Sequence, residues 1–177
     1  MKLENGIEVF VEYLVNKSHL VICGGGHIAL PLCELGRILE FKTTVIDERE
    51  EFANFYRFPM ADNVICGRFD EVLNKSSFSK NTYFVIVTRG HKDDKVCLEA
   101  VIDKGYDYVG MIGSRAKVAN VVTALINEGY SRELIDKVHT PIGLKIGGQT
   151  PAEIAVSIAA EIIQEKNKNK GSEVEEV

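Results

Sequence analysis

Short apolar runs alternate along the chain with longer segments whose apolar residues recur at helical spacing. The runs end at glycine or polar residues and predict buried parallel strands at residues 19–23, 43–46, 64–66, 83–87 and 108–112. The segments between them predict helices at residues 27–40, 93–104, 114–128 and 150–166, and a short helical turn after Ser131. The polar stretch that Asn81 closes is predicted to be a loop. Regular alternation of this kind predicts an α/β fold, a Rossmann-like doubly wound parallel sheet with helices on both faces.

The two ends of the chain stand apart from this alternation. Residues 3–16 place apolar side chains on one side and glutamates on the other, so residues 1–17 are predicted to form an N-terminal helix. Residues 18–166 are the predicted Rossmann-like domain. Its last helix has a strong start, with Thr150 as N-cap, Pro151 at the first position and Glu153 at the third. Residues 167–177 are polar and charged, and we expect them to be disordered.

Composition narrows the classes of function. The 177 residues suit one domain, and 21 basic against 26 acidic residues give a net charge of −5. An acidic chain of this kind lacks the excess of positive charge with which proteins bind nucleic acid or an anionic membrane. The sequence contains no apolar run of membrane-spanning length and no secretory leader, so we expect a cytoplasmic protein. Because two-fold dimers are the commonest oligomers, we expect a homodimer.

The four cysteines, at positions 23, 33, 66 and 97, form no C-x-x-C pair and no cluster with histidines at zinc-binding spacing. Each of them lies in an apolar stretch. The sequence therefore predicts four buried, reduced thiols and no metal site.

The first candidate binding site is the glycine-rich turn after the strand at 19–23. Gly24-Gly25-Gly26-His27 opens a G-x-G-x-x-A pattern in the strand-to-helix context that this pattern requires. Glycine permits the tight turn and lets a phosphate approach the backbone, and the helix start offers free N–H groups. Asp47, at the end of the next strand, stands where a ribose-binding acid belongs. Arg49 suits a phosphate instead, so the type of cofactor stays open.

Two further segments follow predicted strands and open helices at the same edge of the sheet. Thr88-Arg89-Gly90-His91 comes first, and His91 and Asp94 have the spacing that puts two side chains on one helix face. Gly113-Ser114-Arg115 combines a hydroxyl, free helix N–H groups and a guanidinium, a set that suits a phosphate. Each segment is also explained as an ordinary capped helix start with solvated charges, and the residues alone leave both interpretations open.

A last glycine-rich segment, 141–148, includes Gly143 and indicates a backbone that passes close to a ligand or to the neighbouring sheet. The sequence shows no nucleophile elbow, no Ser-His-Asp order and no metal-binding cluster. No catalytic residue and no metal ligand are therefore predicted.

Together these segments resemble the XdhC/CoxI family, the xanthine dehydrogenase accessory proteins. The resemblance lies, in the family's order, in 24–27, 88–94, 113–115 and the long stretch 139–161, which is the most specific. It covers roughly residues 19–165 and implies the Rossmann-type portion of the family. Many members carry two basic residues after the Gly-Ser of the third segment, whereas here Ala116 follows Arg115.

The resemblance implies an accessory protein more than an enzyme. Family members bind molybdenum cofactor, protect it while a cysteine desulfurase sulfurates it, and help to insert it into a molybdenum hydroxylase of the xanthine dehydrogenase type. The cofactor carries a phosphate, sometimes with a nucleotide attached, which the turn at 24–26 or Ser114 and Arg115 would hold. Full-length members have a further N-terminal domain, so the helix at 1–17 is expected to be its remnant or replacement.

Two alternatives stay open at this point. The glycine turn with Asp47 also fits an oxidoreductase or nucleotide sensor that binds NAD(P) or FAD, although the chain leaves little room for a separate substrate domain. The other alternative is a nucleotide-binding fold that keeps its shape without a ligand.

Overall fold

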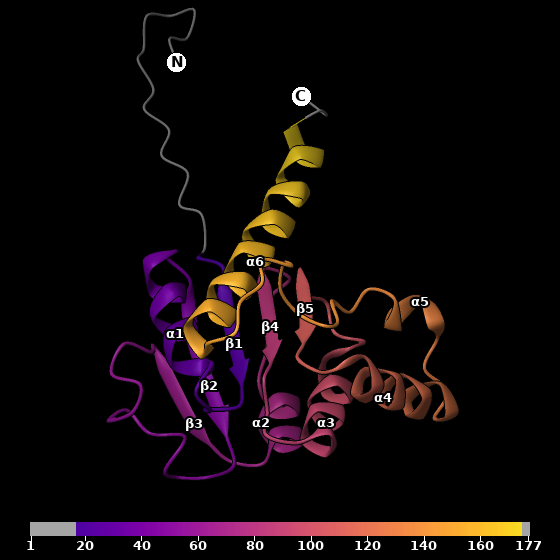
Figure 1. The fold of residues 1–177 in the computed structure, drawn as a ribbon, viewed down its shortest axis with the longest axis horizontal. Helices are drawn as coiled ribbons and strands as arrows, with labels where there is room; N and C mark the ends of the chain where they lie inside the picture. The colour runs from indigo at the N-terminus through magenta and orange to yellow at the C-terminus, as the bar shows by residue number, and fades with distance from the viewer. Residues whose placement is uncertain (1–16, 175–177) are drawn as a thin grey trace, which may run out of the picture.

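The central element of the structure is a parallel β-sheet. The computed structural model describes residues 17–174, without the side chains of residue 91 and of residues 169–174. The strands within this range are all parallel and lie in the order β3-β2-β1-β4-β5 (Figure 1). Their bounds are β1 His19–Cys23, β2 Lys42–Asp47, β3 Asn63–Cys66, β4 Thr82–Ile86 and β5 Tyr108–Met111.

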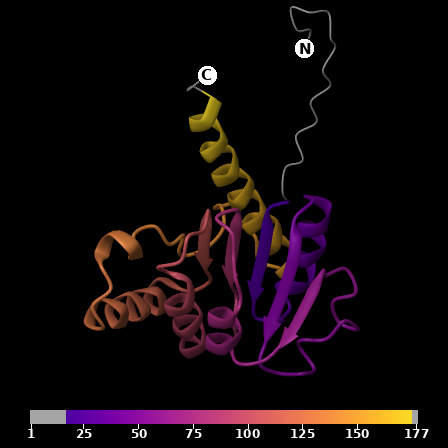
Figure 2. The same cartoon turned by 180° about the vertical axis from the view of Figure 1, so that it is seen from behind.

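Helices cover both faces of this sheet. Their bounds are α1 Ala29–Ile38, α2 Phe69–Lys75, α3 His91–Val101, α4 Arg115–Asn127, α5 Arg132–Ile135 and α6 Pro151–Val174. Helices α1 and α6 pack against one face, and α2, α3 and α4 pack against the other (Figures 1 and 2). This arrangement confirms the predicted α/β fold with a Rossmann-like doubly wound sheet.

The central strands are buried on both faces, which explains why their sequences are continuous apolar runs. Along β1, Val21 and Cys23 contribute to the core under α2, α3 and α4, whereas Leu20 and Ile22 contribute to the core under α1 and α6. The edge strand β3 is different, because its residues are only partly buried. The prediction of four buried thiols is therefore wrong for Cys66, the last residue of β3, which is exposed, and correct for the other three cysteines.

Helix α2 lies where the sequence predicted a loop. It has seven residues and buries only two of them, Phe69 and Leu73. The apolar residues Phe69, Val72 and Leu73 cover little more than one turn, which is too short a pattern to distinguish a helix from a loop. The helix nevertheless covers one face of the sheet, because Phe69 and Leu73 join the core formed with α3.

Helix α6 starts as predicted and ends later than predicted. Glu153 accepts hydrogen bonds from the backbone N–H groups of Gln149 (2.8 Å) and Thr150 (2.9 Å), and the Thr150 hydroxyl accepts one from the Glu153 N–H (3.2 Å), which forms a capping box. The tail expected to be disordered from residue 167 is helical as far as Val174. Residues 164–170 contain no proline and include glutamine, glutamate and several lysines, which favour helix continuation.

Two predictions about the ends of the chain lie outside the described residues: the helix at 3–16 and the last three residues of the tail. Among the helices that are described, none combines the length and apolar character needed to cross a membrane.

Gly143 lets the loop before α6 lie against that helix. Its φ is +97°, and a Cβ at this position would overlap the Ser157 hydroxyl of α6. The Gly143 N–H donates to Glu161 Oε2 (2.8 Å), which also accepts a hydrogen bond from the Tyr108 hydroxyl (2.6 Å) at the start of β5. The sequence left open a ligand or the neighbouring sheet as the close neighbour of this segment, and at Gly143 the structure shows helix α6 instead.

We expect Gly143→Ala to lower the free energy of unfolding more than Gly129→Ala does. Both glycines have a positive φ, +97° and +94°, where an L side chain costs roughly 1–2 kcal/mol. A Cβ at Gly129 would meet no atom within 4 Å, so that variant measures backbone strain alone. Gly143→Ala would also displace the Ser157 hydroxyl from its 2.7 Å hydrogen bond to Leu144 O, which adds about 1 kcal/mol. Urea unfolding followed by circular dichroism measures both losses, and equal losses would contradict the close approach to α6.

Candidate functional site

The strand order creates a crevice at the carboxyl edge of the sheet. The chain leaves β1 toward β2 on one side, whereas β4 continues to β5 on the other, and ligands of open α/β sheets bind at such a switch point. Gly24 to Gly26 follow β1 at this point. The N–H of Gly24 donates to Ile46 O of β2 (2.7 Å), so the glycine turn lies directly beside the end of the neighbouring strand.

Two of the three glycines are explained by close backbone approaches. Gly24 has a φ of +108°, and a Cβ there would lie 2.6 Å from Val87 O. A Cβ at Gly25 would overlap Phe52 O, from the loop after β2. Gly26 is different, because a Cβ there would meet nothing within 4 Å. The space in front of Gly26 is therefore available to a ligand.

The N-terminus of α1 faces this space with unengaged donors. Its N-cap residue, Ile28, makes no side-chain capping bond, and its first turn contains no acidic residue. The backbone N–H groups of Gly26, His27 and Ile28 donate to no described residue. Such a helix start, with free N–H groups and the positive end of the helix dipole, is suited to an anion.

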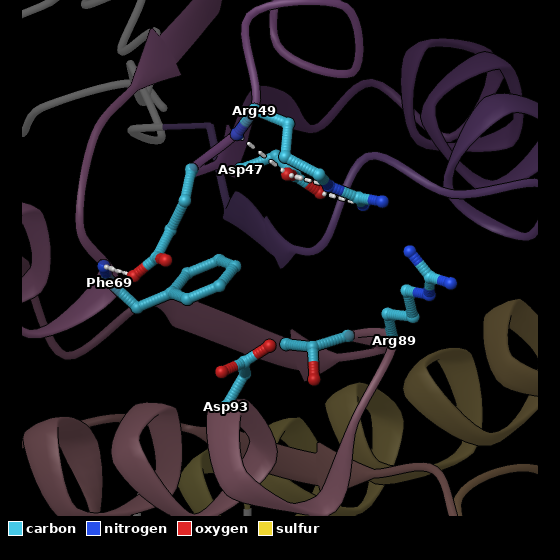
Figure 3. A pocket seen from close by; sticks show the side chains of 7 residues that line it. Asp47, Arg49, Phe69, Arg89 and Asp93 are labelled. Carbon is cyan, nitrogen blue, oxygen red and sulfur yellow. Dashed lines mark hydrogen bonds and ion pairs between the residues drawn. The ribbon is translucent and has the colours of Figure 1, made fainter.

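Two adjoining cavities open at this edge. The larger, about 510 Å³, is lined by Gly24, Gly26, His27, Ile28, Arg49, Phe52, Val87, Thr88, Arg89, Gln149, Pro151 and Ile154. The smaller, about 230 Å³, is lined by Asp47, Glu48, Arg49, Phe69, Thr88, Arg89 and Asp93 (Figure 3). Arg49, Thr88 and Arg89 line both cavities, so these three residues form the boundary between them.

Asp47 and Arg49 form a closed pair at this boundary. The Asp47 side chain is buried, and Arg49 donates to it three times: from its backbone N–H (3.0 Å) and Nε (2.9 Å) to Oδ1, and from Nη2 (2.9 Å) to Oδ2. The N–H of Gly25 donates to Oδ2 (2.8 Å). Burial alone raises the pKa of Asp47, but the hydrogen bonds from Arg49 and Gly25 outweigh burial and hold that pKa below its usual value.

Phe52 holds the arginines of the site in place. The Arg49 guanidinium carbon lies 3.7 Å from the centre of the Phe52 ring, and that of Arg57 lies 5.0 Å from it. Arg57 Nε also donates to Gly25 O (2.9 Å), which fixes the position of the glycine turn. Arg89 differs from both, because it is exposed and makes no hydrogen bond or ion pair with the described part of the chain.

Asp94 links two of the predicted segments, the one that begins at Thr88 and the one that begins at Gly113. It is fully buried, and it accepts a hydrogen bond from the Thr88 hydroxyl (2.5 Å) and pairs with Lys117 Nζ (2.5 Å) in the first turn of α4. Burial raises the pKa of Asp94, and the hydrogen bonds from Lys117 and Thr88 offset only part of that effect. The loop after β4 and the start of α4 are thus held together by one carboxylate.

The structure brings some of the predicted site residues together and separates others. Gly24, Gly26, His27, Arg49, Thr88 and Arg89 line the larger cavity, and Asp47 lines the smaller one. Gly25 supports Asp47, Gly90 is the N-cap of α3, and His91 is its first residue. Gly113, Ser114, Arg115 and Gly143 line neither of these two cavities. The Ser114 hydroxyl instead caps α4 by accepting from the Lys117 N–H (3.3 Å).

Several lining residues were not predicted as site residues from the sequence. Phe52 lies in the aromatic stretch after Asp47, and Gln149, Pro151 and Ile154 come from the start of α6. The strong helix start at Thr150 placed α6 correctly along the chain. It gave no indication that the first turn of that helix lines the cavity.

We expect Asp47→Asn and Asp94→Asn to change the pH dependence of stability in opposite directions. The pKa of Asp47 is lowered by folding, so its contribution to stability is complete above its unfolded value of about 3.9 and is lost as the pH falls. The pKa of Asp94 is raised by folding, so the folded state gains stability from this group as the pH falls through that raised pKa.

Urea midpoints measured from pH 7 to pH 3 at constant ionic strength test these signs. On acidification, the stability advantage of wild type over Asp47→Asn should shrink, whereas the difference between wild type and Asp94→Asn should shift in favour of wild type. Parallel profiles for the two variants would show that the two carboxyl groups have the same kind of environment.

Comparison with known proteins identifies relatives of this chain. The model of the family described as the XdhC Rossmann domain matches residues 20–162. The uncharacterized protein YqeB of Escherichia coli (strain K12) is 29% identical over 166 residues, which are 93% of this chain and 30% of that protein. A probable xanthine dehydrogenase subunit of Bacillus subtilis (strain 168) is 27% identical over 160 residues, which are 90% of this chain and 46% of that protein.

A solved structure has the same fold. The crystal structure of a xanthine dehydrogenase from Bacillus halodurans matches with a TM-score of 0.76 and 30% identity, over 86% of this chain and 43% of that chain. The chain thus spans less than half the length of each of these three proteins. The range matched by the family model contains every residue that lines the two cavities. The chain belongs to the XdhC family, and the matched region is the Rossmann domain of that family.

Proposed function

We propose that this domain binds molybdenum cofactor through its phosphate. The observation that carries the proposal is the group of unengaged donors at the larger cavity: the N–H groups of Gly26, His27 and Ile28, together with the Arg89 guanidinium. Helix N-terminal N–H groups and arginine side chains are both well suited to binding phosphate. Because the chain has a net charge of −5, this local geometry rather than the overall field must attract the anion.

The rest of the larger cavity fits a flat ring system attached to that phosphate. Its volume of about 510 Å³ is in the range of small-molecule sites, roughly 300–1,000 Å³. Ile28, Phe52, Val87 and Ile154 supply apolar surface beside the polar donors. Apolar walls with a few placed polar groups are typical of cofactor sites. The bound cofactor would bring the molybdenum chemistry that a hydroxylase uses, and the lining residues would hold and orient it.

In this role the domain is part of an accessory protein that assists sulfuration of the cofactor and its insertion into a molybdenum hydroxylase. The name of the Bacillus subtilis relative, which describes it as a probable component of xanthine dehydrogenase, supports a hydroxylase as the partner. A cysteine desulfurase as sulfur donor, a cytoplasmic location and a homodimer belong to the same proposal.

A second candidate function is binding of NAD(P) or FAD. The glycine turn favours it, and the smaller cavity lies beside Asp47, where a nucleoside binds in dinucleotide-binding folds. Against it, the Asp47 carboxylate is already engaged by Arg49 and Gly25. The two candidates are separated by a direct comparison of ligands.

We expect the purified chain to bind molybdopterin under anaerobic conditions, and Arg89→Ala to weaken that binding at least tenfold. A hydrogen bond to a charged group contributes about 1.5–3 kcal/mol, which corresponds to a factor of at least ten in Kd. Arg115→Ala is the matched control, because Arg115 is exposed and lines neither cavity. Titration followed by pterin fluorescence measures all three proteins, with NAD, NADP and FAD titrated in parallel.

Equal losses for Arg89→Ala and Arg115→Ala would place the phosphate elsewhere. Binding of a dinucleotide without binding of molybdopterin would replace the proposal by the second candidate function. Activation of an apo-hydroxylase by the loaded protein, and its loss in Arg89→Ala, would test the carrier role itself.

A further inference from the structure

The Asp47 carboxylate already accepts as many hydrogen bonds from the protein as it can. An ionised carboxylate offers about four acceptor positions. At Asp47 the Arg49 N–H and Nε fill Oδ1, and the Gly25 N–H and Arg49 Nη2 fill Oδ2, all at 2.8–3.0 Å. The residue is only 3% exposed. A ribose diol could bind this carboxylate, as it does in dinucleotide-binding folds, only after the Arg49 side chain had left it.

Arg49 is held in that position from two directions. Its bidentate contact with Asp47 fixes the plane of the guanidinium, and the Phe52 ring lies against that plane, 3.7 Å from the guanidinium carbon. Displacing Arg49 would break two charged hydrogen bonds and a cation–π contact together. The closed pair is therefore the expected state of the site before a ligand binds.

The remaining donors of Arg49 belong to a guanidinium that lines the crevice. A guanidinium has five N–H donors, of which Asp47 takes one from Nε and one from Nη2. The remaining donors belong to a side chain that lines both cavities, as Arg89 does. Figure 3 shows the guanidinium ends of Arg49 and Arg89 toward one side of the smaller cavity, with Phe69 and Asp93 toward the other.

We propose that Arg49 is a specificity-determining residue, which closes the ribose site on Asp47 and forms with Arg89 a phosphate subsite where the two cavities meet. The domain then selects a ligand that carries a phosphomonoester at this point over a ligand that offers an unphosphorylated ribose diol. The proposal rests on the proposed function only in using the same crevice, since any ligand with a phosphomonoester at that point satisfies it.

A matched pair of nucleotides tests this selectivity without a pterin. Adenosine 5′-monophosphate offers a free diol, and adenosine 2′,5′-bisphosphate differs from it only by a phosphate on the ribose. By calorimetric titration of the full chain, we expect the bisphosphate to bind at least tenfold more tightly. Arg49→Ala should reverse the order, with weaker binding of the bisphosphate and at least fivefold tighter binding of the monophosphate, because Asp47 regains free acceptors. Arg115→Ala should keep the wild-type ratio and controls for overall charge.

A second, more conservative variant keeps the test decisive if Arg49→Ala fails to fold. Arg49→Lys keeps the positive charge but cannot donate to both oxygens of Asp47 in a fixed plane, so its preference should lie between those of wild type and Arg49→Ala. Wild type that binds neither nucleotide, together with Arg49→Ala that binds the monophosphate, would support the closed ribose site and overturn the phosphate subsite.

Equal affinities in wild type, an unchanged ratio in both Arg49 variants, or no binding by any protein would overturn the proposal. Failure of molybdopterin to bind, with the nucleotide preference intact, would refute the proposed function and leave this inference standing.

Discussion

The shared register of β1, β2 and β4 determines where the groups of the site lie. Cys23, the last residue of β1, is paired with Ile46 on one side and with Ile86 on the other, so the three strands end at one level. The residues that follow them are thereby brought to one point, as the hydrogen bond from Gly25 N–H to Asp47 shows. A shift of one residue in the pairing register of a strand moves all its side chains to the opposite face of the sheet. The position of the site groups therefore depends on the strand register more than on the conformation of any single loop.

The sequence was sufficient for the fold because the sheet is covered on both sides. Strands buried on both faces are continuous apolar runs, which a local pattern reveals, and the start of α6 was correct because the groups of a capping box are neighbours along the chain. The errors come from properties that are not local. Helix α2 is stabilised by two buried side chains on a larger core, and Cys66 is exposed because β3 lies at the edge. Neither the packing partners of a short helix nor the position of a strand in a sheet is determined by nearby residues.

The sequence placed several residues at the candidate crevice, but it did not determine how their side chains are engaged. The positive φ of Gly24 follows from the tight turn that the glycine pattern predicts. Whether Asp47 is free to bind a ligand depends on whether Arg49 folds back onto it, and the Phe52 ring, which is distant from the glycine pattern in sequence, lies against Arg49 in that position. Ile154 reaches the cavity from a helix far along the chain, where an apolar residue is equally suited to the core. Ser114 has the residue type expected for a phosphate contact, but its hydroxyl caps a helix.

The two arginines at the boundary of the cavities differ in their contacts with the described residues, and this difference determines the conformational entropy that each would lose on binding an anion in the proposed site. An arginine side chain has about 2 kcal/mol of rotamer entropy to lose when it becomes fixed. Arg49 loses that freedom when the chain folds, because Asp47 and Phe52 hold it before any ligand arrives. Arg89 makes no such contact with the described residues, so in the proposed site it would lose its rotamer freedom only on binding the anion. In the proposed site, the fixed Arg49 guanidinium would orient the anion at little entropic cost, whereas Arg89 would reach farther and would lose its rotamer entropy in every binding event.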